Sequence, residues 1–156
     1  MSILELVLPL IGVLAGVALS PMFVDRQERK RWHRQQQYAA ARAVTSAARA
    51  VLWRSDEVGQ ARDDGDIEQQ KEAVRQAMFT LRENLADVEL LFSGSVRTAA
   101  QDLENQFGNK LVPYALGLSA KGNDQAQEVV EARRRMTEFQ DAAREAILRG
   151  SGLTRG

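Results

Sequence analysis

The sequence contains no cysteine, only one histidine and only three prolines among 156 residues. The lack of cysteine excludes disulfides and thiolate metal sites, and suits a reducing compartment. The histidine, His33, has Arg29 and Gln37 one helical turn away, so it offers neither a zinc cluster nor the Glu-x-x-His motif of di-iron bundles. A Ser-His-acid triad would have to use this same residue. No glycine-rich phosphate loop is present. We therefore expect no catalytic residue, no metal and no cofactor, and a protein that is not an enzyme.

Charge is also lacking, over the whole stretch from Leu6 to Val24, where Ser20 is the only residue with a polar side chain. As a helix this run would cover about 28 Å, close to the ~30 Å hydrocarbon core of a bilayer. A cleaved signal peptide is disfavoured, because no Lys or Arg precedes the run. Residues 1–24 are therefore predicted to be an N-terminal transmembrane anchor.

A basic collar follows the run, within residues 25–41, which we predict to be a juxtamembrane stalk. Its members are Arg26, Arg29, Lys30, Arg31, Trp32 and Arg34. Since basic residues flank only the C-terminal side, the positive-inside rule predicts a single-pass protein of the inner (cell) membrane, with Met1 outside and the C-terminal domain in the cytoplasm. The collar serves either to bind anionic lipid headgroups or only to set this topology, and the sequence leaves both open.

Small residues recur along the predicted span at Gly12, Gly16 and Ser20. Small side chains one turn apart allow two membrane helices to approach closely, so this face is a candidate for self-association or partner docking. Glycine is common in membrane helices, however, and the pattern also arises without such a role.

The net charge of zero hides an uneven distribution. Residues 25–54 carry eight basic and two acidic side chains, whereas residues 55–156 carry thirteen and eighteen. Basic charge beside the bilayer favours attraction to anionic lipids of the inner leaflet. Nucleic-acid binding is not expected, because the distal part lacks a basic surplus.

The rest of the chain shows apolar stripes at helical, coiled-coil-like spacing, which predict helices over residues 25–62, 66–92, 95–118 and 124–149. Short turns join them, so the fold class is all-α: a membrane helix followed by an antiparallel bundle of approximately four helices over residues 42–149, with a flexible tail at 150–156. Gly108, Pro113 and Gly117 predict that the segment 107–118 is bent or broken. The predicted core residues are Val44, Val51, Val74, Met78, Leu81, Leu85, Val88, Leu103, Phe107, Val129, Met136 and Phe139.

Polar residues at the turns are interpreted as helix caps: Asp66, Ser95 and Asp124. The aspartates around Gly65 do not match a calcium-binding EF-hand loop. Arg133, Arg134 and Arg135 are adjacent and so spread around a helix, which favours solvated pairs with neighbouring acids over a phosphate site.

The order of segments resembles that of many short bacterial membrane proteins rich in alanine and arginine. This likeness concerns composition and order only, so it implies no function or residue role. The sequence favours a non-enzymatic, membrane-tethered interaction or scaffold module that binds a protein partner or itself. The alternatives are a membrane-active effector that oligomerises through its anchor, and a small sensor or accessory subunit of a membrane complex.

Overall fold

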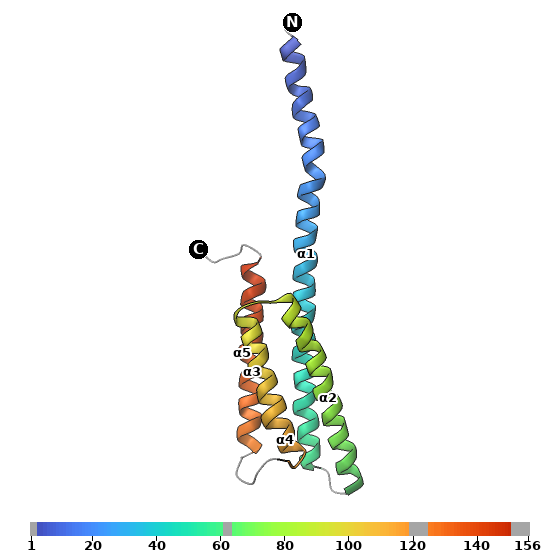
Figure 1. The fold of residues 1–156 in the computed structure, drawn as a ribbon, viewed down its shortest axis with the longest axis vertical. Coiled ribbons are helices and arrows are strands. Elements are labelled where there is room, and N and C mark those ends of the chain that lie inside the picture. The colour runs from blue at the N-terminus through green and yellow to red at the C-terminus, as the bar shows by residue number, and fades with distance from the viewer. Residues whose placement is uncertain (1–2, 61–63, 119–124, 151–156) are drawn as a thin grey trace. The chain divides into compact units, whose positions relative to one another are not determined.

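The computed structural model describes residues 3–60, 64–118 and 125–150; of residues 3–27, Asp64 and Gln125 it describes the backbone only. These residues are all helical apart from short turns (Figure 1). The elements are α1 (Ile3–Gln60), α2 (Asp64–Leu91), α3 (Ser95–Gln106), the π-helix η1 (Phe107–Leu111), α4 (Val112–Ala115) and α5 (Gln125–Arg149). The chain divides into two compact units, residues 1–35 and 36–156, which are described separately.

The first unit consists of the N-terminal part of α1, which continues through Pro9 and Pro21 without a break in the helix. The uncharged run of the predicted anchor, Leu6–Val24, lies where no side chain is described, and so does the small-residue face at Gly12, Gly16 and Ser20. In the described part of the chain, no helix is both long enough and apolar enough to cross a membrane. The anchor stays a prediction.

The second unit is an antiparallel helical bundle, as predicted. In Figure 1 its helices α1, α2, α3 and α5 lie roughly parallel to a common axis, and successive helices run in opposite directions. Side chains join neighbouring helices: Arg82 of α2 pairs with Glu104 of α3 at 3.2 Å, and Gln140 of α5 lies 3.5 Å from the Thr45 hydroxyl of α1. The unit begins at residue 36, six residues before the predicted bundle start.

One continuous hydrophobic core fills the bundle. Ten of the twelve predicted core residues are buried, while Val129 and Met136 are half-buried and pack against the core. The helices contribute unequally: among its described side chains α1 buries none larger than valine, whereas α2 buries Met78, Leu81 and Leu85. Such small side chains allow the axis of a helix to approach its neighbours closely.

Alanines account for much of what the stripe analysis missed. Ala40 and Ala132 are buried, although neither was among the predicted core residues. Conversely, Phe79, which broadens the apolar stripe of α2 in the sequence, is 60% exposed, and Ala126 is exposed as well. The stripe gives the direction of a helix's buried face, but the width of that face depends on the number of neighbours.

Two predicted caps are wrong. Helix α2 already begins at Asp64, so Asp66 lies inside its first turn. Helix α3 has Gly94 at its N-cap position with φ of 61°, and Ser95 is its first residue. Positive φ favours glycine, which explains why the cap position falls on Gly94 and not on the serine. The third candidate, Asp124, lies outside the described residues.

The predicted irregularity after α3 takes the form of a π-helix. From Phe107 to Leu111 the helix widens by one residue, and Val112–Ala115 then continues as α4 up to a turn at Gly117, where φ is 72°. The extra residue rotates the helix that follows, so that Leu111, Val112 and Ala115 are all buried after Phe107. A Cβ atom at position 108 would lie 3.2 Å from the Arg82 guanidinium and 3.3 Å from Met78 Cε, so a larger residue there would displace the ends of these two flexible side chains slightly.

Candidate functional site

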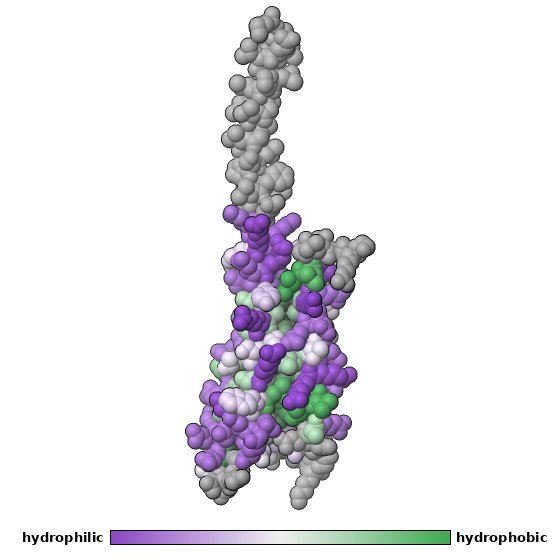
Figure 2. Space-filling view, turned by 180° about the vertical axis from the view of Figure 1, so that it is seen from behind, coloured by the Kyte–Doolittle hydropathy of each residue, from purple (hydrophilic) through white to green (hydrophobic). Residues whose placement is uncertain are grey.

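Two open grooves follow the line where α1 and α5 meet within the bundle; together we call them the α1/α5 seam. The first, of about 480 Å³, is lined by apolar side chains that include Tyr38, Ala41 and Ile147. The second, of about 390 Å³, is lined by Leu52, Trp53, Val129 and Met136. Both grooves include Arg49, so they meet at that residue. Figure 2 shows two hydrophobic areas over the two ends of α5 with hydrophilic side chains between them.

The charged residues of the seam are almost all arginines. Arg42, Arg49 and Arg144 line the first groove, and Arg49 and Arg133 line the second. Asp56 is the one acidic lining residue, and its carboxylate accepts a hydrogen bond from Gln60 at 2.8 Å. Within the described part of the chain, none of the four guanidinium groups forms an ion pair. The seam therefore presents uncompensated positive charge beside apolar surface.

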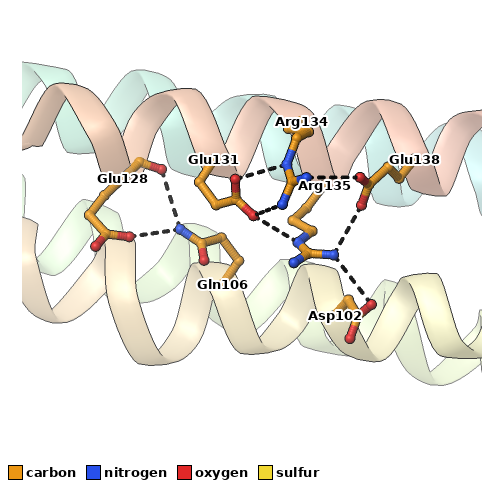
Figure 3. Close-up of polar contacts among 7 residues, drawn as sticks. All are labelled: Asp102, Gln106, Glu128, Glu131, Arg134, Arg135 and Glu138. Atoms are coloured by element: carbon orange, nitrogen blue, oxygen red, sulfur yellow. Dashed lines mark hydrogen bonds and ion pairs between the residues drawn. The ribbon is translucent and has the colours of Figure 1, made fainter.

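Arginines elsewhere on α5 behave differently, as Figure 3 shows. Arg135 Nη1 lies 3.1 Å from Glu138 and 3.5 Å from Asp102 of α3, and Arg134 Nε donates to Glu131 at 2.8 Å. Gln106 of α3 donates to Glu128 at 2.8 Å. Of the three adjacent arginines, Arg134 and Arg135 therefore have the predicted acidic partners, whereas Arg133 lies in the second groove.

The ion pairs shift the titration of the exposed carboxylates. The hydrogen bond from Arg134 and its positive charge lower the pKa of Glu131 below the ordinary value of 4.5, and the same contact raises the pKa of Arg134. Lys71 lowers the pKa of Glu68, and Arg75 that of Glu72, in the same way. These groups stay charged near neutral pH, and each pair lies within a single helix, α2 or α5.

A third groove, of about 390 Å³, lies between α1 and α2. Its floor is alanine, at positions 39, 40 and 43, and its far wall carries Asp87, Leu90 and Leu91 of α2. Leu90 is 85% exposed, the highest value among the large apolar side chains that the structure describes. Helix α1 thus has an arginine-lined groove on the side of α5 and an alanine-floored one on the side of α2.

The described part of the predicted collar is exposed except for Arg34, which is half-buried. Trp32 is 62% exposed, as an interfacial side chain would be before it meets lipid, and Arg34 Nε donates to the Lys30 carbonyl at 3.3 Å. Arg29, Lys30 and Arg31 are exposed too, while the side chain of Arg26 lies outside the described residues. The topology or lipid role of the collar stays a prediction.

Other candidate chemistry is sparse. In the described ranges, no group of three or more histidine, aspartate or glutamate side chains could hold a metal ion. One polar group stands out in the core: Ser55 is 1% exposed and its hydroxyl has no hydrogen-bond partner. Ser55 follows Val44, Ala48 and Val51 at helical spacing, so it lies on the buried face of α1 that packs into the core.

No family model, no curated protein and no solved structure matches this chain. The interpretation of the site therefore depends on its own residues. The α1/α5 seam was missed in the sequence because its members are about 100 residues apart, and only the fold brings Arg42 and Arg144 to one groove. The signal that could have indicated it is the absence of acidic residues around Arg42 and Arg49 on their own helix.

Proposed function

We propose that this protein is a non-enzymatic, membrane-tethered interaction module whose helical bundle binds a protein at the cytoplasmic face of the membrane. The observation that carries the proposal is the α1/α5 seam, where open apolar grooves lie beside four arginines without ion pairs. Unpaired arginines next to exposed apolar and aromatic side chains are typical of surfaces that bind other proteins.

The tether is supported by the sequence of the first unit. The uncharged run Leu6–Val24 has the length of a membrane span, and the exposed collar that follows has the charge that keeps such a flank in the cytoplasm. A tethered module works at a fixed surface, where a high local concentration permits individually weak contacts to be effective.

The test is affinity purification of the full-length chain from native membranes in mild detergent, followed by mass measurement of the complex. Arg49→Glu is the informative variant because Arg49 belongs to both grooves, and Lys110→Glu is the matched control because it reverses one exposed charge in η1, outside the seam. We expect wild type and Lys110→Glu to yield a stoichiometric complex, and Arg49→Glu to lose it.

Recovery of all three proteins as monomers would overturn the proposal. Dye release from liposomes by the wild-type chain would instead support a membrane-active effector, because a tether should release nothing.

A further inference from the structure

The exposed face of α2 has a composition complementary to the α1/α5 seam. Phe79, Glu83, Asp87 and Leu90 follow one another at four-, four- and three-residue steps, so they share one face of the helix. Phe79 is 60% exposed and Leu90 is 85% exposed, with the two carboxylates between them. In the described part of the chain neither carboxylate forms an ion pair. We call these four residues the α2 face.

The two surfaces also match in length. Phe79 and Leu90 are eleven residues apart, which is about 16 Å along a helix. The apolar residues of the two grooves have this same separation on both walls: Ala41 and Leu52 on α1, and Ile147 and Met136 on α5. On both the α2 face and the α1/α5 seam, charged residues therefore lie between two apolar regions about the same distance apart. The charged residues are carboxylates on the α2 face and arginines on the seam.

The level of the α2 face along the bundle is fixed by a single contact. Gln37 of α1 donates to the main-chain carbonyl of Leu91, so Leu90 lies at the level of Tyr38 and Ala41, which line the first groove. Phe79, about 16 Å further along the antiparallel α2, then falls at the level of the second groove. Two copies standing side by side would place both apolar anchors opposite their grooves without a vertical shift.

We propose that the occupant of the α1/α5 seam is the α2 face of a second copy of this chain. This inference depends on the proposed function, since two copies tethered to one membrane would stand at the same height. Glu83 and Asp87 would then lie between Arg42, Arg49 and Arg144, where opposite charges fix the register of the contact. Seam and α2 face are different surfaces, so the contact is heterologous and each copy can bind one neighbour on either side.

The absence of cysteine provides a direct test, because an introduced thiol is the only one in the chain. Ala86→Cys places a thiol on the exposed side of α2, and Gln140→Cys places one in the first groove. The two full-length variants, with different affinity tags, are reconstituted together in phosphatidylcholine vesicles and treated with a short bis-maleimide. This zwitterionic lipid has no net charge, so its headgroups compete less for the arginines than anionic lipids would.

We expect a covalent dimer that carries both tags only when the Ala86→Cys and Gln140→Cys chains are mixed. Each variant alone should give none, and Gln101→Cys, at an exposed position of α3, should give none with Gln140→Cys. Adding Glu83→Arg and Asp87→Arg to the α2 partner places like charges across the interface, which should lower the yield at least about tenfold. Adding Arg42→Glu and Arg49→Glu to the seam partner should then restore it.

Circular dichroism of each variant establishes that it is folded. The inference is wrong if folded variants give no mixed dimer, or if the charge reversals leave its yield unchanged. If the mixed dimer is absent while Arg49→Glu still abolishes a complex with another protein in native membranes, the second copy is not the occupant and the proposed function stands. Absence of both the dimer and any complex overturns both.

Discussion

Gln37 Nε2 donates a 2.9 Å hydrogen bond to the carbonyl oxygen of Leu91, the last residue of α2 and 54 positions later in the chain. The last carbonyls of a helix have no partner within the helix, and a part-buried one needs a donor from elsewhere. Gln37 supplies it, which ties α1 to the end of α2 at the point where the bundle begins.

Replacing Gln37 with alanine should lower the free energy of unfolding by about 1 kcal/mol, because the Leu91 carbonyl would lose its donor. Thermal or urea unfolding followed by circular dichroism measures this. Gln36→Ala is the matched control, since Gln36 is exposed and adjacent, and it should change stability much less. Equal effects of the two substitutions would contradict a capping role.

Leu85→Asp should destabilise the bundle by several kcal/mol, because Leu85 is 4% exposed and the substitution buries a carboxylate without a partner. Leu90→Asp, five residues later on the same helix and 85% exposed, is the control and should melt close to wild type. If Leu85→Asp also melts like wild type, the core assigned to α2 is wrong.

Ser55→Ala should raise stability by about 1 kcal/mol, because it removes a buried hydroxyl that has no hydrogen-bond partner. Alanine also has the higher helix propensity, so part of any gain would come from the backbone. Ser46→Ala, on the exposed side of the same helix, should change stability through helix propensity alone, so its effect is subtracted from that of Ser55→Ala. Gains of the same size at both positions would mean that the Ser55 hydroxyl costs nothing.

Glu131 should make the stability of the bundle depend on pH. Its pKa in the folded chain is lowered by Arg134, so its contribution is present above about pH 4.5 and is lost as the pH falls through the lowered value. The melting temperature of Glu131→Gln should therefore lie below that of wild type at neutral pH, and the difference should shrink on acidification. Because the pair is solvent-exposed, 1 M salt should shrink it as well. A difference that persists at pH 2 would contradict this cause.

Neutralising the collar should weaken or scramble membrane orientation, since the charges on one flank decide which side stays in the cytoplasm. The substitutions are Arg29→Gln, Lys30→Gln, Arg31→Gln and Arg34→Gln, with topology read from reporter enzymes fused to the C-terminus. The control replaces as many basic residues far from the predicted span: Arg49, Lys110, Arg133 and Arg144. Unchanged orientation after the collar substitutions would mean that later charges or folding of the bundle decide it.

The sequence predicted the helices and the direction of their buried faces well, because the spacing of apolar residues indicates which face of each helix packs against its neighbours. Leu81, Leu85 and Val88 follow one another at four- and three-residue steps, which is typical of a helix face that packs in a core, and all three are buried. Turn details were harder: at Ser95 the hydroxyl suggested a cap, but the backbone required positive φ at Gly94 instead.

The candidate site could not be predicted, because it depends on distances between elements. Arg42 and Arg144 belong to ordinary helical faces in the sequence, and only the packing of α5 against α1 makes them walls of one groove. The three adjacent arginines of α5 also show that the sequence does not give contacts between helices. Arg134 and Arg135 found acidic partners nearby, while the position of Arg133 toward α1 could be known only from the fold.

The small side chains by which α1 enters the core have a mechanical consequence. Burial stabilises in proportion to apolar area, so the fully buried alanine, valine and serine side chains of α1 each contribute less than Met78, Leu81 and Leu85 of α2. Helix α1 is also the one that is continuous with the N-terminal segment. A pulling force applied through that segment would reach the bundle through α1, so it would load the contacts of these small side chains before those of the larger side chains on α2.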